Sequence, residues 1–187
     1  MKLFGTMKVE NRVLMIGGVK VTELAAKYGT PLYIMDQALI EENIIKYKNN
    51  FKSTKFDTSI VYASKAFLSK AICQLVGKYD IDIDAVSGGE LYAIKASGLP
   101  MKKVHMHGNN KTNEELEMCL DYEIGSIVID NEEEIERLSK ICKEKNKKVK
   151  VMMRINIGID AHTHEYIKTS KHSSKFGESI FDERITE

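Results

Sequence analysis

Lys65 is the residue of this chain whose position most clearly suggests chemistry. It follows the run Ser59–Ser64, which has the composition of a short buried strand. Val61, Ala63 and Lys65 then fall on one strand face. Burial favours the neutral form of a lysine amine, and a neutral amine can attack an aldehyde. On this segment alone, the simpler interpretation is that the strand ends here and Lys65 reaches water.

Asp84 and Glu90 lie in a second candidate segment. Ser87 and Glu90 have the spacing of a helix capping box, which by itself could explain Glu90. Asp84 is not explained by capping. It lies near the C-terminal end of an expected strand, where the active sites of barrels and other α/β folds are built. A carboxylate at that position could orient a histidine or complement a positively charged ring.

Arg154 is placed similarly, near the end of the expected strand Val149–Asn156. Its guanidinium could pair with a carboxylate or with a phenolate-like oxygen. A surface arginine at a strand end is an equally consistent interpretation of this segment alone.

The histidines raise the alternative of a metal site. His105 and His107 share a strand face, and so do His162 and His164 if their segment is extended. A catalytic zinc usually takes three protein ligands, often including an acidic residue, and Glu165 could serve. Because the segment lacks a helical His-Glu pattern, we expect no metal.

Strand-like and helix-like segments alternate from about residue 57 onward. Such βα units at short spacing indicate a parallel sheet covered by helices. Five strands without a glycine fingerprint favour an α/β fold that is part of a TIM-type barrel over a Rossmann sheet. The expected strands are Ile60–Ser64, Ile81–Val86, Val104–His107, Ser126–Asp130 and Val149–Asn156, and the expected helices are Leu68–Lys78, Gly88–Ser97, Thr112–Tyr122 and Glu132–Lys145.

Residues 1–56 have a different pattern, and we expect them to form a lead-in domain, with residues 57–187 as the first part of the barrel. Val13–Val21 resembles a strand interrupted by a glycine turn, and Leu32–Met35 resembles another strand. Asp36 is expected to cap a helix that extends to about Asn50. The expected buried stripe of that helix is Leu39, Ile40, Ile44 and Tyr47.

The composition is that of an ordinary soluble protein, with 43% apolar and 29% charged residues among 187. A net charge of +1 gives no basic footprint for nucleic acid. No apolar run approaches the roughly 18 residues of a membrane span. The cysteines, Cys73, Cys119 and Cys142, have spacings typical of neither zinc sites nor disulfide frameworks, so we expect thiols in the cytoplasm.

Taken together, the candidate segments resemble the N-terminal part of the diaminopimelate decarboxylase family, which belongs to the alanine-racemase-like, pyridoxal-phosphate-dependent barrel enzymes. The matches occur in the family's order and span nearly the whole chain. They are Tyr28–Tyr33, Tyr62–Ala66, Asp84–Leu91, His107–Lys111, Arg154–Asn156, Gly158–Ile167 and Ser174–Gly177. The last two favour the diaminopimelate branch over the ornithine and arginine branches.

The resemblance implies that pyridoxal 5'-phosphate is the cofactor and that Lys65 binds it covalently. It implies that Asp84, Glu90 and Arg154 lie around the cofactor. It also implies a small amino-acid substrate, and a homodimer for the intact enzyme.

The family continues well beyond this length, with further barrel strands, a glycine-rich phosphate loop and a C-terminal β domain. We therefore expect this chain to hold about five of the eight barrel strands and to be inactive by itself. The function implied for the intact enzyme is decarboxylation of meso-2,6-diaminopimelate to L-lysine and CO2. The alternatives are another basic amino-acid decarboxylase or racemase of the same fold, or a non-catalytic module for binding or assembly.

Overall fold

A computed structural model describes residues 2–157 and 176–180 of the chain. The chain forms two compact units, Met1–Ile60 and Val61–Glu187. A compact unit is not by itself a domain that folds alone. The expected division into residues 1–56 and 57–187 therefore stays a prediction.

The first unit begins with a small antiparallel sheet in the order β1-β2-β3. Val9 pairs with Leu14 between the first two strands, and Ile16 pairs with Val19 across the glycine turn that the sequence predicted. Helix α1 follows directly, and α2 comes after an irregular stretch. The bounds are β1 Lys8–Glu10, β2 Val13–Ile16, β3 Val19–Lys20, α1 Val21–Tyr28 and α2 Gln37–Asn50.

Asp36 caps α2 as expected, and it also ties the helix to the start of the chain. One carboxylate oxygen accepts the Leu39 amide at 3.2 Å, and the other accepts the amide and the hydroxyl of Thr6 at 3.0 and 2.6 Å. The Thr6 hydroxyl lowers the pKa of Asp36. The expected buried stripe is wrong at Tyr47, which is 64% exposed, because nothing in the described part of this unit covers that end of the helix.

The expected strand Leu32–Met35 is also wrong. These residues have no strand conformation and are exposed, although their side chains are apolar. A strand requires a neighbouring strand to satisfy its backbone groups, and no described strand pairs with this segment. Apolar composition alone therefore overpredicted regular structure here.

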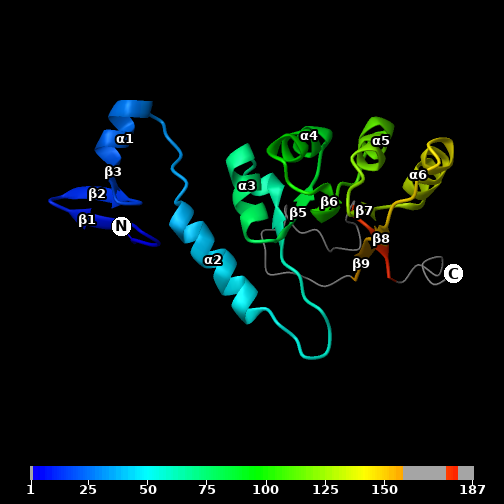
Figure 1. Cartoon of the computed structure of the whole chain (residues 1–187), viewed down its shortest axis with the longest axis horizontal. Helices are drawn as coiled ribbons and strands as arrows, with labels where there is room; N and C mark the ends of the chain where they lie inside the picture. Colours follow the sequence, from blue (N-terminus) through cyan, green and yellow to red (C-terminus); the bar gives the residue numbers. More distant parts are fainter. Residues whose placement is uncertain (1, 158–175, 181–187) are drawn as a thin grey trace. The chain divides into compact units, whose positions relative to one another are not determined.

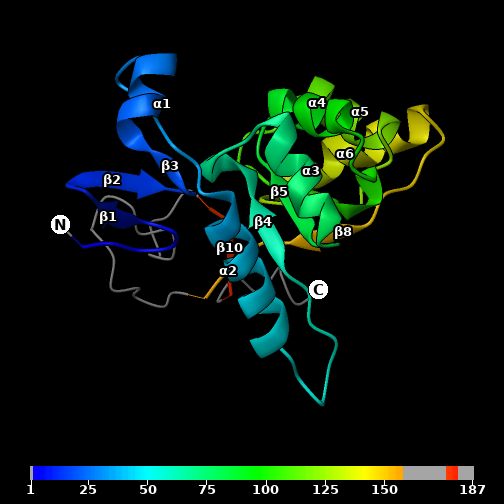
Figure 2. The same cartoon turned by 60° about the vertical axis from the view of Figure 1, so that its left-hand side comes forward.

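The described part of the second unit contains a five-stranded parallel sheet in the order β4-β5-β6-β7-β8. Each strand pairs with the next one in sequence, and helices α3 to α6 lie together on one side of the sheet (Figure 1 and Figure 2). A doubly wound sheet would reverse its order and carry helices on both faces, so this arrangement is that of a barrel segment. The strand bounds are β4 Val61–Ala63, β5 Asp82–Ala85, β6 Val104–Met106, β7 Ser126–Ile129 and β8 Val151–Met153.

Three successive helices begin with the same local device, a polar N-cap followed three residues later by glutamate. Ser87 and Glu90 begin α4, and Asn131 and Glu134 begin α6. The predicted capping box of α5, formed by Thr112 and Glu115, is confirmed, while Ser69 caps α3 without a glutamate partner. The helix bounds are α3 Lys70–Lys78, α4 Gly88–Ser97, α5 Asn113–Asp121 and α6 Glu132–Glu144, with short 3-10 turns at η1 Ser64–Ala66 and η2 Met101–Lys103.

The hydrophobic core lies between the sheet and these helices. Strand residues alternate, so that one side chain packs under the helices and the next points to the opposite face. The core pattern places polar side chains of β5 and β6 on the face that the helices do not cover. The fully buried apolar residues include Ile83, Ala85, Val104, Met106, Leu91, Ile94, Leu116, Cys119 and Ile127.

The expected last strand is divided at Arg154. After β8, the short strand β9 (Ile155–Asn156) pairs in parallel with β10 (Glu178–Ser179). Backbone bonds from Glu178 to the Arg154 carbonyl and from Ile180 to the Asn156 carbonyl, both at 3.0 Å, continue this pairing. Among the described residues, no helix has the length and apolar character needed to cross a membrane.

Candidate active site

Polar side chains occupy the uncovered face of the parallel sheet in two layers. The His105 ring lies across the strands, with its Nε2 3.1 Å from Asp82 and its Nδ1 2.7 Å from the Ser126 hydroxyl. Nearer the carboxyl ends, His107 Nε2 lies 3.2 Å from the carboxylate of Asp84. The carboxyl end of such a sheet is the edge at which α/β enzymes build their sites.

Lys65 lies at this edge, in the 3-10 turn that directly follows β4. The expectation that it continues an inward strand face is wrong, because β4 ends at Ala63 and the Lys65 side chain is exposed. Among the described residues, no hydrogen bond or ion pair holds its amine. The amine is therefore accessible to a small molecule at the sheet edge.

The turn that carries Lys65 is fixed by the residues around it. The Tyr62 hydroxyl donates to the Phe67 carbonyl at 2.6 Å, which closes the turn, and burial raises the pKa of that hydroxyl. Ser64 is 1% exposed, and its hydroxyl has no hydrogen-bond partner in the described part of the chain. A buried hydroxyl without a partner is uncommon.

Asp84 lies one strand away from Lys65. Its Cα pairs with that of Ala63, two residues before the lysine. Of the two roles considered for this carboxylate, the structure shows the first, because Asp84 pairs with the His107 ring. The pair is about one-third exposed at both members, so it faces the same open edge as Lys65.

Glu90 is explained in large part by the start of α4. Its carboxylate accepts the Val86 amide at 2.6 Å, and its own amide donates to the Ser87 hydroxyl at 3.3 Å. The carboxylate thus reaches back one residue further than a standard capping box, since the partner is Val86 and not Ser87. Only part of this carboxylate is left to contact a ligand.

Arg154 is held at the far end of the sheet by two residues that the sequence reasoning did not assign to a site. Its Nη1 lies 3.3 Å from Asp130, whose side chain is 2% exposed, and its guanidinium lies over the Phe176 ring at 4.4 Å. The other Asp130 oxygen accepts the Gly177 amide at 3.0 Å. Phe176 and Gly177 end the Ser-Lys-Phe-Gly motif, so two separate motifs meet at Arg154.

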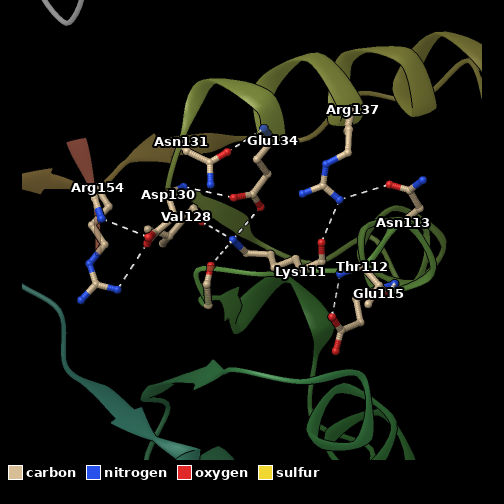
Figure 3. A network of polar contacts seen from close by, with 12 residues as sticks. Lys111, Thr112, Asn113, Glu115, Val128, Asp130, Asn131, Glu134, Arg137 and Arg154 are labelled. Atoms are coloured by element: carbon tan, nitrogen blue, oxygen red, sulfur yellow. Dashed lines mark hydrogen bonds and ion pairs between the residues drawn. The ribbon is translucent and has the colours of Figure 1, made fainter. Parts of the chain in front are cut away.

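A network of buried charged residues lies next to Asp130 and Arg154, as Figure 3 shows. Its centre is Lys111, whose side chain is 1% exposed and whose amine lies 2.6 Å from the equally buried Glu134. The sequence did contain a signal for Glu134, because it follows the helix cap Asn131 by three residues. The burial of Lys111 could not be read from the polar segment that contains it.

The four predicted site residues come to one edge of the sheet, but they form no polar contact with one another in the described part of the chain. In the described ranges, no hydrogen bond or ion pair joins any two of Lys65, Asp84, Glu90 and Arg154, and the last three have other partners. Residues 2–157 and 176–180 contain no cluster of His, Cys, Asp or Glu suited to a metal ion. The alternative ligands His162, His164 and Glu165 lie outside the described residues.

Residues 37–186 match the sequence profile described as "Pyridoxal-dependent decarboxylase, pyridoxal binding domain". The chain belongs to this family of pyridoxal-dependent decarboxylases. The family confirms the cofactor expected from the sequence, pyridoxal phosphate.

Individual relatives show which enzymes of this family the chain is similar to. A diaminopimelate decarboxylase from Bacillus methanolicus is 49% identical over 178 residues, which is 95% of this chain and 41% of the relative. The crystal structure of diaminopimelate decarboxylase from M. jannaschii in complex with L-lysine aligns with a TM-score of 0.81 at 35% identity, over 94% of this chain and 41% of that one. The chain thus spans about two fifths of the length of these relatives.

A further solved structure is similar to the chain in its fold alone. The lysine/ornithine decarboxylase from Vibrio vulnificus, complexed with putrescine, aligns with a TM-score of 0.60 at 18% identity, over 71% of this chain and 34% of that one. The alignments with solved structures agree with the barrel arrangement described above.

The described residues fit the aldehyde end of pyridoxal phosphate. An aldehyde requires an accessible amine, and Lys65 supplies one at the carboxyl edge of the sheet. The buried Ser64 hydroxyl beside it has a hydrogen bond to give or accept. Asp84 and Arg154 add charges of both signs to the same edge, so a polar, charged cofactor matches the groups present.

Proposed function

We propose that the protein to which this chain belongs decarboxylates meso-2,6-diaminopimelate to L-lysine and CO2, with Lys65 as the residue that binds pyridoxal phosphate. The observation that carries the proposal is the exposed Lys65 amine at the strand edge of a pyridoxal-binding domain. The substrate assignment is supported by 49% identity to a diaminopimelate decarboxylase and by L-lysine in the M. jannaschii structure.

When bound, pyridoxal phosphate supplies an electron sink that stabilises the charge left behind as CO2 departs. The chain supplies the groups that hold and orient it. Lys65 would hold the cofactor through its amine, and the Tyr62 bond to the Phe67 carbonyl keeps the lysine turn in place. The Asp84 carboxylate lies 3.2 Å from Nε2 of the His107 ring and orients that ring at the site.

Arg154 and Glu90 form the remaining walls in this proposal. Asp130 and Phe176 restrict the Arg154 guanidinium, which has further N–H groups to offer an anionic oxygen. Glu90 keeps the strand-to-helix turn of β5 and α4 rigid through the Val86 amide. We assign both residues to positions around the cofactor, and we assign neither a part in the bond-breaking step.

Two further features belong to the same proposal. A cytoplasmic location is supported by the thiols of Cys73, Cys119 and Cys142, none of which forms a disulfide in the described chain. A homodimer is proposed for the intact enzyme from the family resemblance, and sedimentation of the intact enzyme tests it.

Cofactor binding by the purified chain tests the assignment of Lys65. Three proteins are compared: the wild type, Lys65→Ala and Lys70→Ala. Each is titrated with pyridoxal phosphate and reduced with borohydride, and its mass is then measured by mass spectrometry. Lys70 is an exposed lysine at the start of α3, so its variant controls for nonspecific reaction. We expect one adduct on wild type and on Lys70→Ala and none on Lys65→Ala. Equal labelling of all three proteins contradicts the proposal and favours a non-catalytic binding module.

Competition between substrates tests the reaction assigned. In the intact enzyme, meso-diaminopimelate should be decarboxylated with release of CO2, whereas ornithine should not be decarboxylated at the same concentration. Preferred turnover of ornithine, or racemisation without CO2, would transfer the assignment to one of the other activities expected from the sequence. The expectation that the 187 residues alone release no CO2 stays a prediction, and the same assay tests it.

A further inference from the structure

Lys111 is a lysine whose amine is buried among acceptors. It lies just after the β6 loop and is 2% exposed as a residue. Its amine donates to the carbonyls of Gly108 and Val128, both at 2.7 Å, and lies 2.6 Å from Glu134. The two carbonyls accept two of the three N–H donors of the ammonium, and Glu134 lies at ion-pair distance. Because this amine is buried, it is not accessible to an aldehyde, and we consider its contribution to be geometric.

The acceptors of Lys111 come from three separate segments. Gly108 belongs to the loop after β6, Val128 to β7, and Glu134 to the first turn of α6. One buried amine thus joins three neighbouring structures at the carboxyl edge of the sheet (Figure 3). Removing one partner of a buried ion pair leaves an uncompensated charge, so a single substitution at this junction is expected to disturb it.

The junction continues toward Arg154 through a chain of direct contacts. The second Glu134 oxygen accepts the Asp130 amide at 3.1 Å, which fixes the backbone where β7 ends. The Asp130 carboxylate in turn lies 3.3 Å from Arg154 and accepts the Gly177 amide at 3.0 Å. Figure 3 shows these residues in a continuous row from Lys111 to Arg154.

We propose that Lys111 is a positioning residue, which acts through Glu134 and Asp130 to fix the orientation of Arg154. The cofactor role of Arg154 rests on the proposed function, but its placement by Lys111 does not. The bond from Arg137 to the Lys111 carbonyl at 2.9 Å anchors the backbone of this residue as well, so both ends of the lysine are fixed.

Chemical modification of Arg154 tests the proposal without any cofactor. Phenylglyoxal reacts with exposed guanidinium groups, and peptide mass spectrometry gives its rate at each arginine. The exposed Arg12 serves as the internal reference. The test variant is Lys111→Met combined with Glu134→Gln, which removes both charges while Gln can still accept the Asp130 amide. The control is Lys147→Met, because Lys147 also contacts a carbonyl and a carboxylate but is remote from Arg154 in the contact network.

We expect the double variant to modify Arg154 roughly tenfold faster relative to Arg12, since a charge-assisted contact would be loosened. Hydrogen exchange at the Gly177 backbone amide should accelerate as well. The backbone amides of β6 should exchange at the wild-type rate. Lys147→Met should leave the Arg154 rate unchanged. A folded double variant with the wild-type Arg154 rate overturns the proposal, and so does equal acceleration in Lys147→Met.

Glu134→Gln alone provides a second variant, and circular dichroism checks that each variant is folded. It keeps the side-chain size and the acceptor for the Asp130 amide, and removes only the charge that faces Lys111. A several-fold faster Arg154 reaction supports the proposal, and an unchanged rate overturns it. Because pyridoxal phosphate is absent from these assays, failure of the proposed function would not affect their outcome.

Discussion

Accessibility distinguishes two lysines at the carboxyl edge of the sheet. The sequence left two interpretations for Lys65, a buried strand face or a side chain that reaches water; Lys65 is exposed, and Lys111 is the buried lysine. The chemical assignment of Lys65 does not depend on burial, because an exposed amine can also react with an aldehyde. The burial of Lys111 could not be predicted, because its partners come from three segments that only the tertiary structure brings together.

Asp130 illustrates the same limit on sequence reasoning. It ended an expected strand, but its partners Arg154 and Gly177 lie 24 and 47 residues away along the chain. Asp84, in contrast, could be chosen from local pattern alone, because capping did not explain it. Residues whose role depends on distant partners are those that the sequence analysis missed.

Replacing Asp130 should destabilise the fold measurably. Asp130→Ala leaves the Gly177 amide and the Arg154 guanidinium without their shared acceptor, and we expect a loss of roughly 1.5–3 kcal/mol in the free energy of unfolding. Urea denaturation followed by circular dichroism measures it. Asp121→Ala is the matched control, because Asp121 pairs with two lysines at an exposed site and should matter much less. Equal losses would show that burial of Asp130 contributes nothing.

Cys119 should make stability depend on alkaline pH. Burial raises the pKa of its thiol from the ordinary 9.0 to about 12. Its contribution is complete below pH 9 and is lost as pH rises from 9 toward 12, because only the unfolded thiol ionises there. The expected slope is about 1.4 kcal/mol per pH unit. In urea titrations across this range, Cys119→Ala should show a shallower decline than wild type; identical slopes would contradict the assignment.

At the scale of elements, local signals were most reliable where a helix has its own start and stop. The range Gly88–Ser97 was predicted as it is found, because Ser87 caps it and Gly98 ends it in a left-handed conformation. Leu32–Met35 was mispredicted because strand formation depends on a partner. The division of the last strand at Arg154 had no local signal either, since it is caused by the pairing of β9 with the distant β10.

Gly177 should be essential for that pairing. It has φ of +68°, and an added Cβ would lie 2.7 Å from the Arg154 carbonyl oxygen. Gly177→Ala should therefore separate β10 from β9 and accelerate amide exchange at Glu178 and Ile180 on the order of tenfold. Gly18→Ala is the control, because Gly18 also has positive φ, at +79°, but open space around it. If both variants leave exchange at Glu178 unchanged, the close approach at Gly177 has no structural consequence.

At the scale of the whole molecule, the parallel sheet covered by helices was the most successful prediction. Alternating βα segments implied a parallel sheet, and the observed order β4-β5-β6-β7-β8 with helices on one side confirms it. Short connections favour pairing between sequence neighbours, so topology could be inferred without knowing any contact. The same topology brings Lys65, Asp84 and Arg154 to one edge, although they are separated widely in sequence.

The site on which this account depends can be mapped in one measurement. The wild-type chain is incubated with pyridoxal phosphate, reduced with borohydride and digested, and the modified lysine is identified by peptide mass spectrometry. We predict modification at Lys65, with the peptide that contains Lys111 unmodified because its amine is buried among three acceptors. Modification of Lys111, or labelling spread over the surface lysines with Lys65 unmodified, would contradict the account.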